Sequence, residues 1–118
     1  VGSPKYDYAN LHVTNGKIAA LQGEPLTVQI DHYRRSYSVT PTLNNVLLLS
    51  QTLMALAVER RDEETARESL FYYSMYIPNV NRDPVERGII LRVLKEDYLR
   101  QFPALAPSIL ALMNRYLR

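Results

Sequence analysis

The stretch that decides the predicted fold is LHVTNGKIAAL, residues 11–21. Two short runs of alternating apolar and polar residues flank Asn15-Gly16, a dipeptide that tolerates the positive φ angles of a type I′ hairpin turn. A two-residue loop fixes the register of the two strands, so four apolar side chains would share one face of the sheet. These are Leu11, Val13, Ile18 and Ala20. The stretch therefore predicts a β-hairpin.

The neighbouring segments extend this predicted β region. Residues 1–10 predict an extended lead-in, and the alternating pattern of residues 26–30 predicts a third strand. Residues 33–39 predict a fourth strand or the continuation of the third. Thr40-Pro41 ends the region, because the residue before a proline avoids the helical conformation. Residues 11–40 are thus expected to be rich in β-structure.

The remaining residues, 41–118, predict about four helices. They are expected over residues 43–60, from Asp62 to Pro78, from Asp83 to Pro103, and from about Pro107 onward. The first is apolar on nearly all sides, which predicts a central position. Asp62 and Asp83 are N-cap residues in this interpretation, and Pro84 suits the first position of its helix.

Two of these helices carry apolar residues at helical spacing, which predicts the side that faces the core. The predicted core residues are Ala66, Leu70, Tyr73 and Ile77 in the second helix, and Ile90, Leu94, Tyr98 and Phe102 in the third. Inside a helix, glycine is about 1 kcal/mol less favourable than alanine. We therefore interpret Gly88 as a position where a neighbouring element packs closely against the helix. Strands followed by helices predict one α+β domain over residues 1–118, with an antiparallel sheet of three to four short strands packed on the helices.

Composition limits the classes of function. The chain has 118 residues, a formal net charge of +2 and no cysteine, so disulfides, thiolate metal sites and thiol catalysis are excluded. The longest apolar run, residues 46–58, is shorter than the roughly 20 residues of a membrane span. We therefore expect a soluble protein without a membrane span, with the cytoplasm slightly favoured. The chain begins with Val1 rather than methionine, which favours a processed or excised piece of a longer protein.

The sequence contains no established catalytic motif. The predicted hairpin register places His12 on the solvated face, and two separated histidines without cysteine argue against a zinc site. The four glycines form no phosphate-binding loop, and neither a nucleophile elbow nor a kinase motif occurs. We therefore predict no catalytic residue, metal or cofactor, and a protein that is not an enzyme. A weaker alternative is a hydrolase that uses Asp31, His32 and a distant partner.

An aromatic segment, residues 71–77, points to protein binding. Tyr73 and Ile77 belong to the predicted core side of their helix, so the other large side chains project elsewhere. These are Phe71, Tyr72, Met75 and Tyr76. Aromatic residues and methionine are enriched in interface cores, although burial in the intramolecular core is the alternative. The leading hypothesis is a non-enzymatic interaction or oligomerisation module, such as an adaptor or assembly factor, that binds itself as a homodimer or another protein.

A second hypothesis is a nucleic-acid-binding accessory protein. The predicted residues are Tyr33, Arg34, Arg35 and Tyr37. In a strand, Tyr33, Arg35 and Tyr37 would share one face, on which bases could stack and a phosphate could be neutralised. The basic C-terminal segment supports this hypothesis. The alternative interpretation is that the two tyrosines cover the core while Arg35 extends to the rim.

Overall fold

The computed structural model describes residues 3–118, in which there are six α-helices and no β-strand. The helices are α1 (Pro4–Leu21), α2 (Leu26–Val39), α3 (Leu43–Arg60), α4 (Glu63–Tyr76), α5 (Pro84–Arg92) and α6 (Ala106–Tyr116). A π-helix over Val93–Leu99 continues α5, and single 3₁₀ turns lie at Ile77–Asn79 and Pro103–Leu105. The predicted α+β class is therefore wrong: the protein is all-α.

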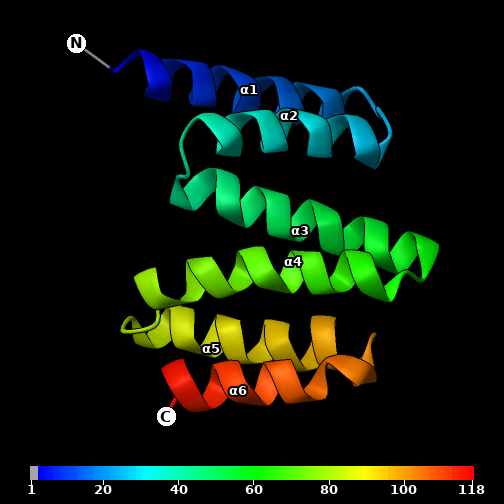
Figure 1. The fold of residues 1–118 in the computed structure, drawn as a ribbon, viewed down its shortest axis with the longest axis vertical. Coiled ribbons are helices and arrows are strands. Elements are labelled where there is room, and N and C mark those ends of the chain that lie inside the picture. Colours follow the sequence, from blue (N-terminus) through cyan, green and yellow to red (C-terminus); the bar gives the residue numbers. More distant parts are fainter. Residues whose placement is uncertain (1–2) are drawn as a thin grey trace.

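Successive helices run antiparallel and stack in chain order, with α1 at one end and α6 at the other (Figure 1). The connections are short, so α1–α2, α3–α4 and α5–α6 form three helical hairpins, an arrangement typical of α-solenoids. The stack measures 39 × 34 × 21 Å, and the long dimension runs across the helices. No helix within residues 3–118 is long and apolar enough to cross a membrane.

The predicted sheet is replaced by the helical hairpin α1–α2. The buried residues of α1 share one face of a helix, with each buried residue three or four positions from another: Ala9, His12, Val13, Gly16 and Ala19. The helical period, rather than the alternation around Asn15-Gly16, therefore describes this segment. Leu11 and Ile18, which the strand register turned inward, are 55% and 45% exposed. The predicted lead-in over residues 1–10 is helical from Pro4 onward, and its first two residues lie outside the described part of the chain.

Gly16 is inside a helix because α2 approaches α1 closely at this position. A Cβ atom on Gly16 would lie 2.5 Å from Cε1 of Tyr33, whose side chain is buried in α2. The true turn glycine is Gly23, which has a φ of 71° and ends α1. The close packing predicted at Gly88 is wrong, since a Cβ atom there would meet nothing within 4 Å.

The helical prediction for residues 41–118 is confirmed in its main features. α3 has the predicted bounds, and Asp62 and Asp83 cap α4 and α5 by accepting hydrogen bonds from backbone N–H groups. The predicted core residues are all buried: Ala66, Leu70, Tyr73, Ile77, Ile90, Leu94, Tyr98 and Phe102. Together with residues of α3 and α6 they form the larger of two hydrophobic clusters.

The π-helix after α5 explains why core residues recur every four positions there. In an α-helix, four residues cover about 400° around the helix axis, about 40° more than a full turn. Side chains repeated every four residues therefore shift around the axis by about 40° at each repeat. A π-helix winds more slowly and reverses this drift. It keeps Leu94 and Tyr98 on the buried side with Ile90, and it brings Val93 and Asp97 to a side that faces α3.

A buried polar network joins the first three helices. The side-chain amide of Asn45, fully buried in α3, donates hydrogen bonds to Oγ of Ser36 and to the carbonyl of Thr40, both at 2.9 Å. Its Oδ1 accepts one from the backbone N–H of Thr42 at 2.9 Å. Ser36 in turn donates to the carbonyl of Ala9 at 2.8 Å. The network therefore fixes α1, α2 and the start of α3 relative to one another.

Candidate functional site

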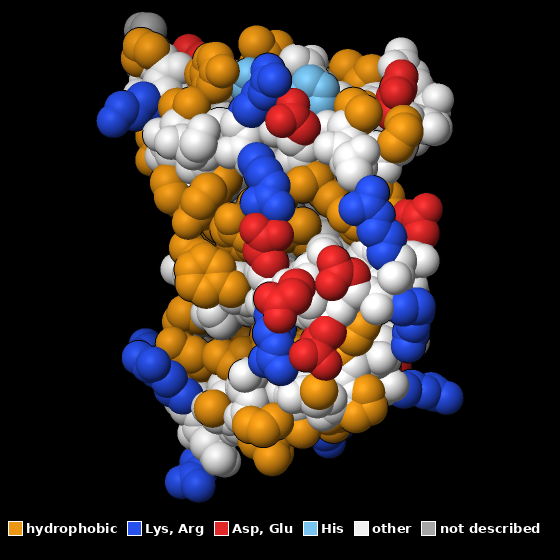
Figure 2. Space-filling model, turned by 45° about the vertical axis from the view of Figure 1, so that its right-hand side comes forward, with side chains coloured by type: hydrophobic (Ala, Val, Ile, Leu, Met, Phe, Trp, Pro, Cys, Tyr) orange, Lys and Arg blue, Asp and Glu red, His pale blue; other side chains and the backbone are white. Residues whose placement is uncertain are grey.

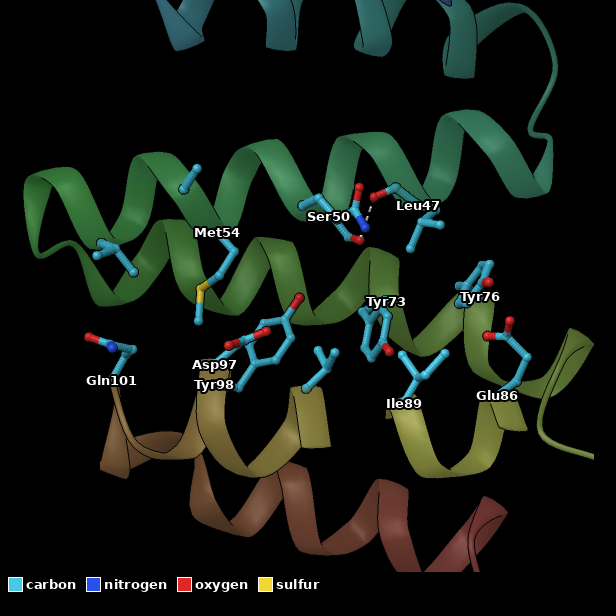
Figure 3. A pocket seen from close by; sticks show the side chains of 14 residues that line it. Leu47, Ser50, Met54, Tyr73, Tyr76, Glu86, Ile89, Asp97, Tyr98 and Gln101 are labelled. Atoms are coloured by element: carbon cyan, nitrogen blue, oxygen red, sulfur yellow. Dashed lines mark hydrogen bonds between the residues drawn. The ribbon is translucent and has the colours of Figure 1, made fainter. Parts of the chain in front are cut away.

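A groove with a volume of about 740 Å³ runs between α3 and the continuous helix formed by α5 and the π-helix, with α4 behind it (Figure 3). We call it the α3–α5 groove. Leu47, Met54 and Val58 line its α3 side, and Ile89 and Val93 line the opposite side. The named residues of each side are four or seven positions apart, which corresponds to one or two helical turns, so each wall is one face of a helix. The groove is thus apolar over most of its length.

Three tyrosines line the inner part of the α3–α5 groove. The ring of Tyr73 stacks on Tyr98 with centroids 5.7 Å apart and on Tyr76 with centroids 5.8 Å apart. The hydroxyl of Tyr98 lies 2.8 Å from Oγ of Ser69, so this buried phenol has a hydrogen-bond partner. Burial raises the pKa of all three phenols above the usual value. They therefore form a neutral aromatic floor at physiological pH.

The charged residues of the α3–α5 groove are two carboxylates. Among its fourteen lining residues, all within the described chain, only Glu86 and Asp97 are charged. They are eleven residues apart, which corresponds to about 16 Å along the helix. Neither forms an ion pair with a basic side chain in residues 3–118. The Glu86 carboxylate adds to burial in raising the pKa of Tyr76. The groove thus offers a negative, partly apolar surface.

A smaller groove, of about 390 Å³, lies on the other side of α4, between α4 and α6. Its charged lining residues are Arg67 and Arg115, so its charge is opposite to that of the α3–α5 groove. Arg67 is already paired with Glu63 at 3.2 Å. Phe71, which is 58% exposed, lies at this groove.

The four predicted partner-binding residues do not lie together on one surface. Tyr76 lines the α3–α5 groove and Phe71 the smaller groove. Tyr72 and Met75 face α2, where the ring of Tyr37 meets that of Tyr72 edge-on at 5.2 Å and its hydroxyl lies 3.9 Å from Sδ of Met75. Partner binding by these residues stays a prediction, and Tyr76 is the member that belongs to the larger groove.

The predicted nucleic-acid residues lie on a helix, so the shared strand face of Tyr33, Arg35 and Tyr37 does not exist. Both tyrosines pack inward, and the two arginines have acidic partners. Arg34 donates two hydrogen bonds of 2.8 Å to Glu68, and Arg35 pairs with Asp31 at 3.0 Å. Acidic and basic side chains also alternate over the face shown in Figure 2. Nucleic-acid binding stays a prediction without the surface on which it was based.

The two histidines of the chain meet at the α1–α2 contact. Nδ1 of His12 lies 3.5 Å from Nδ1 of His32, and the ring of Tyr8 packs edge-on against His12 at 4.5 Å. His12 is 9% exposed, so the prediction that it is solvated is wrong. Asp31 pairs with Arg35. Burial, followed by His32 and Arg35, lowers the pKa of His12, while Asp31 opposes this shift.

We expect the stability of the protein to fall on mild acidification, chiefly because His12 is buried and secondarily because His32 lies beside it. The pKa of His12 is lower in the folded state, so the unfolded chain binds more protons below about pH 6.5. The stabilisation of the folded state by neutral His12 is fully present above about pH 7 and is lost as the pH falls toward the lowered pKa of this residue. Urea midpoints measured near pH 7.5 and pH 5.5 should differ less in His12→Gln than in the wild type. Equal differences in the two proteins would contradict the assignment.

Residues 3–118 contain no group of three or more side chains suited to hold a metal ion. Comparison of the chain with protein-family models, with curated proteins and with solved structures gave no match. The α3–α5 groove is therefore the candidate site on the strength of its own geometry and chemistry. Met54, Glu86 and Asp97 were not among the residues predicted from the sequence, although Glu86, Ile89, Val93 and Asp97 follow one another at intervals of three or four positions along one helix.

Proposed function

We propose that the protein is a non-enzymatic interaction module that binds an apolar, positively charged segment of a partner protein in the α3–α5 groove. The observation that carries this proposal is the combination of apolar walls and a tyrosine floor with Glu86 and Asp97 as the charged lining residues. Ligand sites are commonly concave and mostly apolar, with a few polar groups that fix orientation. Here those groups are carboxylates without basic partners.

The two parts of the lining have different roles in this proposal. Leu47, Met54 and Val93 take up apolar side chains of the segment, which contributes about 25 cal/mol per Å² of apolar surface removed from water. A lysine or arginine beside Tyr76 and Glu86 gains both a carboxylate partner and the face of an aromatic ring. The stacked tyrosines are already ordered, so binding costs little side-chain entropy there.

The positions of the carboxylates also specify the spacing of charges in the partner. Positive groups that reach both Glu86 and Asp97 must be about 16 Å apart. A helical segment reaches this distance with about eleven residues, and an extended segment with about five. The expected partner therefore carries basic residues at one of these spacings, with apolar residues between them.

We expect Glu86→Lys combined with Asp97→Lys to weaken binding of a basic amphipathic peptide by at least about tenfold, because each carboxylate contact becomes a repulsion. The probe is a fluorescein-labelled helical peptide of leucine, alanine and two lysines about eleven residues apart. Fluorescence anisotropy at low and high salt measures the affinity. A peptide with glutamate in place of lysine should bind weakly to the wild type and better to the double variant.

The matched control is Glu96→Lys, since Glu96 is exposed on the same π-helix but does not line the groove. It should leave the affinity within about twofold of the wild type. Ala55→Trp fills the groove without changing its charge and should also weaken binding. The proposal fails if the lysine and glutamate peptides bind the wild type equally, or if Glu96→Lys has the effect of the double variant.

A further inference from the structure

The two histidines, which are twenty residues apart in the sequence, point their Nδ1 atoms toward each other across the α1–α2 contact. The two Nδ1 atoms are 3.5 Å apart, whereas the ring centroids are 5.7 Å apart and the ring planes are inclined by 30°. The difference between the two distances is close to the diameter of the five-membered ring, so the rings meet Nδ1 to Nδ1 rather than face to face. The fold thus brings together the two residues whose separation in the sequence argued against a zinc site.

The facing Nδ1 atoms are available as ligands. Within residues 3–118 neither ring has a hydrogen-bonding partner other than the opposite ring. A neutral imidazole carries one proton, and with that proton on Nε2 the lone pair of Nδ1 is free to bind a metal ion. Two lone pairs that point at each other repel, so a cation held between them would stabilise the contact.

The distance between the two nitrogens favours a tetrahedral ion. A direct hydrogen bond between the rings would bring the nitrogens to roughly 3.0 Å. Neighbouring ligands of a square-planar copper(II) or nickel(II) ion would be about 2.9 Å apart. Two zinc–nitrogen bonds of about 2.05 Å at the tetrahedral angle place the nitrogens about 3.3 Å apart. The observed 3.5 Å is closest to the separation expected for zinc.

The histidine contact lies close to solvent. His12 is buried, but His32 is half-buried, and Figure 2 shows histidine atoms at the surface at the α1 end of the stack. Of the charged side chains nearest to His12, Asp31 and Arg35 form an ion pair with each other at 3.0 Å. Within residues 3–118 no third metal-binding side chain joins the two histidines. Water from the nearby surface would therefore complete the coordination.

We propose that Nδ1 of His12 and Nδ1 of His32 bind one Zn²⁺ ion per chain, with water in the remaining positions. The ion connects α1 to α2 and so stabilises the first helical hairpin. Structural zinc sites have four protein ligands, so this two-histidine site binds zinc more weakly and exchanges it more readily. The α3–α5 groove is not involved, and the zinc site does not depend on the binding of a peptide there.

Isothermal titration calorimetry of the metal-free chain with zinc chloride tests the site. We expect one ion per chain, and about 0.5 mM zinc chloride should raise the thermal midpoint by at least about 3 °C, because the ion binds the folded pair of histidines. Magnesium chloride at the same concentration should leave the midpoint unchanged, since magnesium prefers oxygen ligands. Absence of both binding heat and a thermal shift up to about 1 mM zinc would overturn the proposal.

Substitution of each histidine tests the ligands. His12→Gln and His32→Gln should each weaken zinc binding at least about tenfold, and the double variant should bind little more weakly than either single variant, because the two ligands act together. The matched control is Glu86→Gln combined with Asp97→Gln, which removes the groove carboxylates and should leave zinc affinity within about twofold of the wild type. Unchanged affinity in either histidine variant would overturn the proposal.

Nuclear magnetic resonance of the ¹⁵N-labelled wild type tests the ligands without any substitution. Zinc should shift the Nδ1 resonances of both imidazole rings and leave the proton of each ring on Nε2. A zinc-induced shift confined to one ring, or to the Nε2 atoms, would contradict the proposed geometry.

Discussion

Replacing Asn45 with alanine is expected to lower the free energy of unfolding by about 3 kcal/mol. The substitution removes the hydrogen bonds from the Asn45 amide to Ser36 and to the carbonyl of Thr40, and the one that Oδ1 accepts from Thr42. Asn45 is fully buried, so water does not replace these partners freely. Urea denaturation of the wild type and the variant measures the difference.

Two further variants show whether the network is the cause. Asn44→Ala changes an exposed neighbour in the same turn of α3 and should alter stability by less than about 0.5 kcal/mol. Asn45→Asp keeps the acceptor for Thr42 but loses the amide hydrogen bonds to Ser36 and to the carbonyl of Thr40, so its loss of stability should be no smaller than that of two buried hydrogen bonds. If Asn44→Ala and Asn45→Ala have similar effects, the network does not stabilise the α2–α3 junction.

Gly16→Ala is expected to destabilise the protein by about 2 kcal/mol, although alanine is the better helix former. Its Cβ atom would lie 2.5 Å from Cε1 of Tyr33, so either the ring or the whole of α1 must move. The ring has little freedom, because Tyr33 is 3% exposed and packs in a cluster with Ile30 and Leu49. The thermal midpoint and the urea midpoint should both fall.

The control for Gly16→Ala is the same substitution at the other helical glycine. Gly88→Ala should stabilise the protein by up to about 1 kcal/mol, because the added methyl group meets nothing within 4 Å. In a protein with Tyr33→Leu, Gly16→Ala should lose most of its cost, since the contacting ring is absent. A similar effect of the two glycine substitutions would show that close packing of α1 on α2 does not decide the result.

The proposed binding groove and the proposed zinc site lie in different parts of the same stack. The α3–α5 groove lies in its second half, where the π-helix turns Val93 and Asp97 toward α3. The zinc site lies at the α1–α2 contact, on the other side of α3. His12→Gln should therefore weaken zinc binding without changing the affinity for the basic peptide.

Much of the second half of the fold could be predicted from the sequence. Asp62 and Asp83 are side chains that cap helices, and Pro84 fits the first turn because its missing N–H has no partner there. The core residues of α4 and α5 follow from helical spacing. These signals are local, so they do not depend on what packs against the helices. The four-residue spacing of the core residues from Ile90 to Phe102 also reflects the π-helix, although an ordinary α-helix was predicted there.

The first third was predicted wrongly because a local turn signal competed with a weak helical pattern. Asn15-Gly16 between short apolar runs is typical of a hairpin, and the buried residues of α1 include Gly16 and His12, which do not mark an apolar side.

The candidate site could be predicted only in part. Tyr76 was among the predicted partner-binding residues. Glu86 and Asp97 belong to the site because they lie opposite α3 across the groove, and sequence spacing does not reveal which helix lies opposite a residue.

By itself the sequence determined where α3, α4 and α5 begin, which apolar residues of α4 and of the continuous helix of α5 and the π-helix form the core, and that cysteine chemistry is absent. The tertiary structure alone decided that residues 11–21 are helical. The physical reason is contact over long sequence distances: Tyr33 of α2 occupies the space that a side chain at position 16 would fill, and Ser36 binds the carbonyl of Ala9. These contacts convert an apparent turn into the centre of a packed helix.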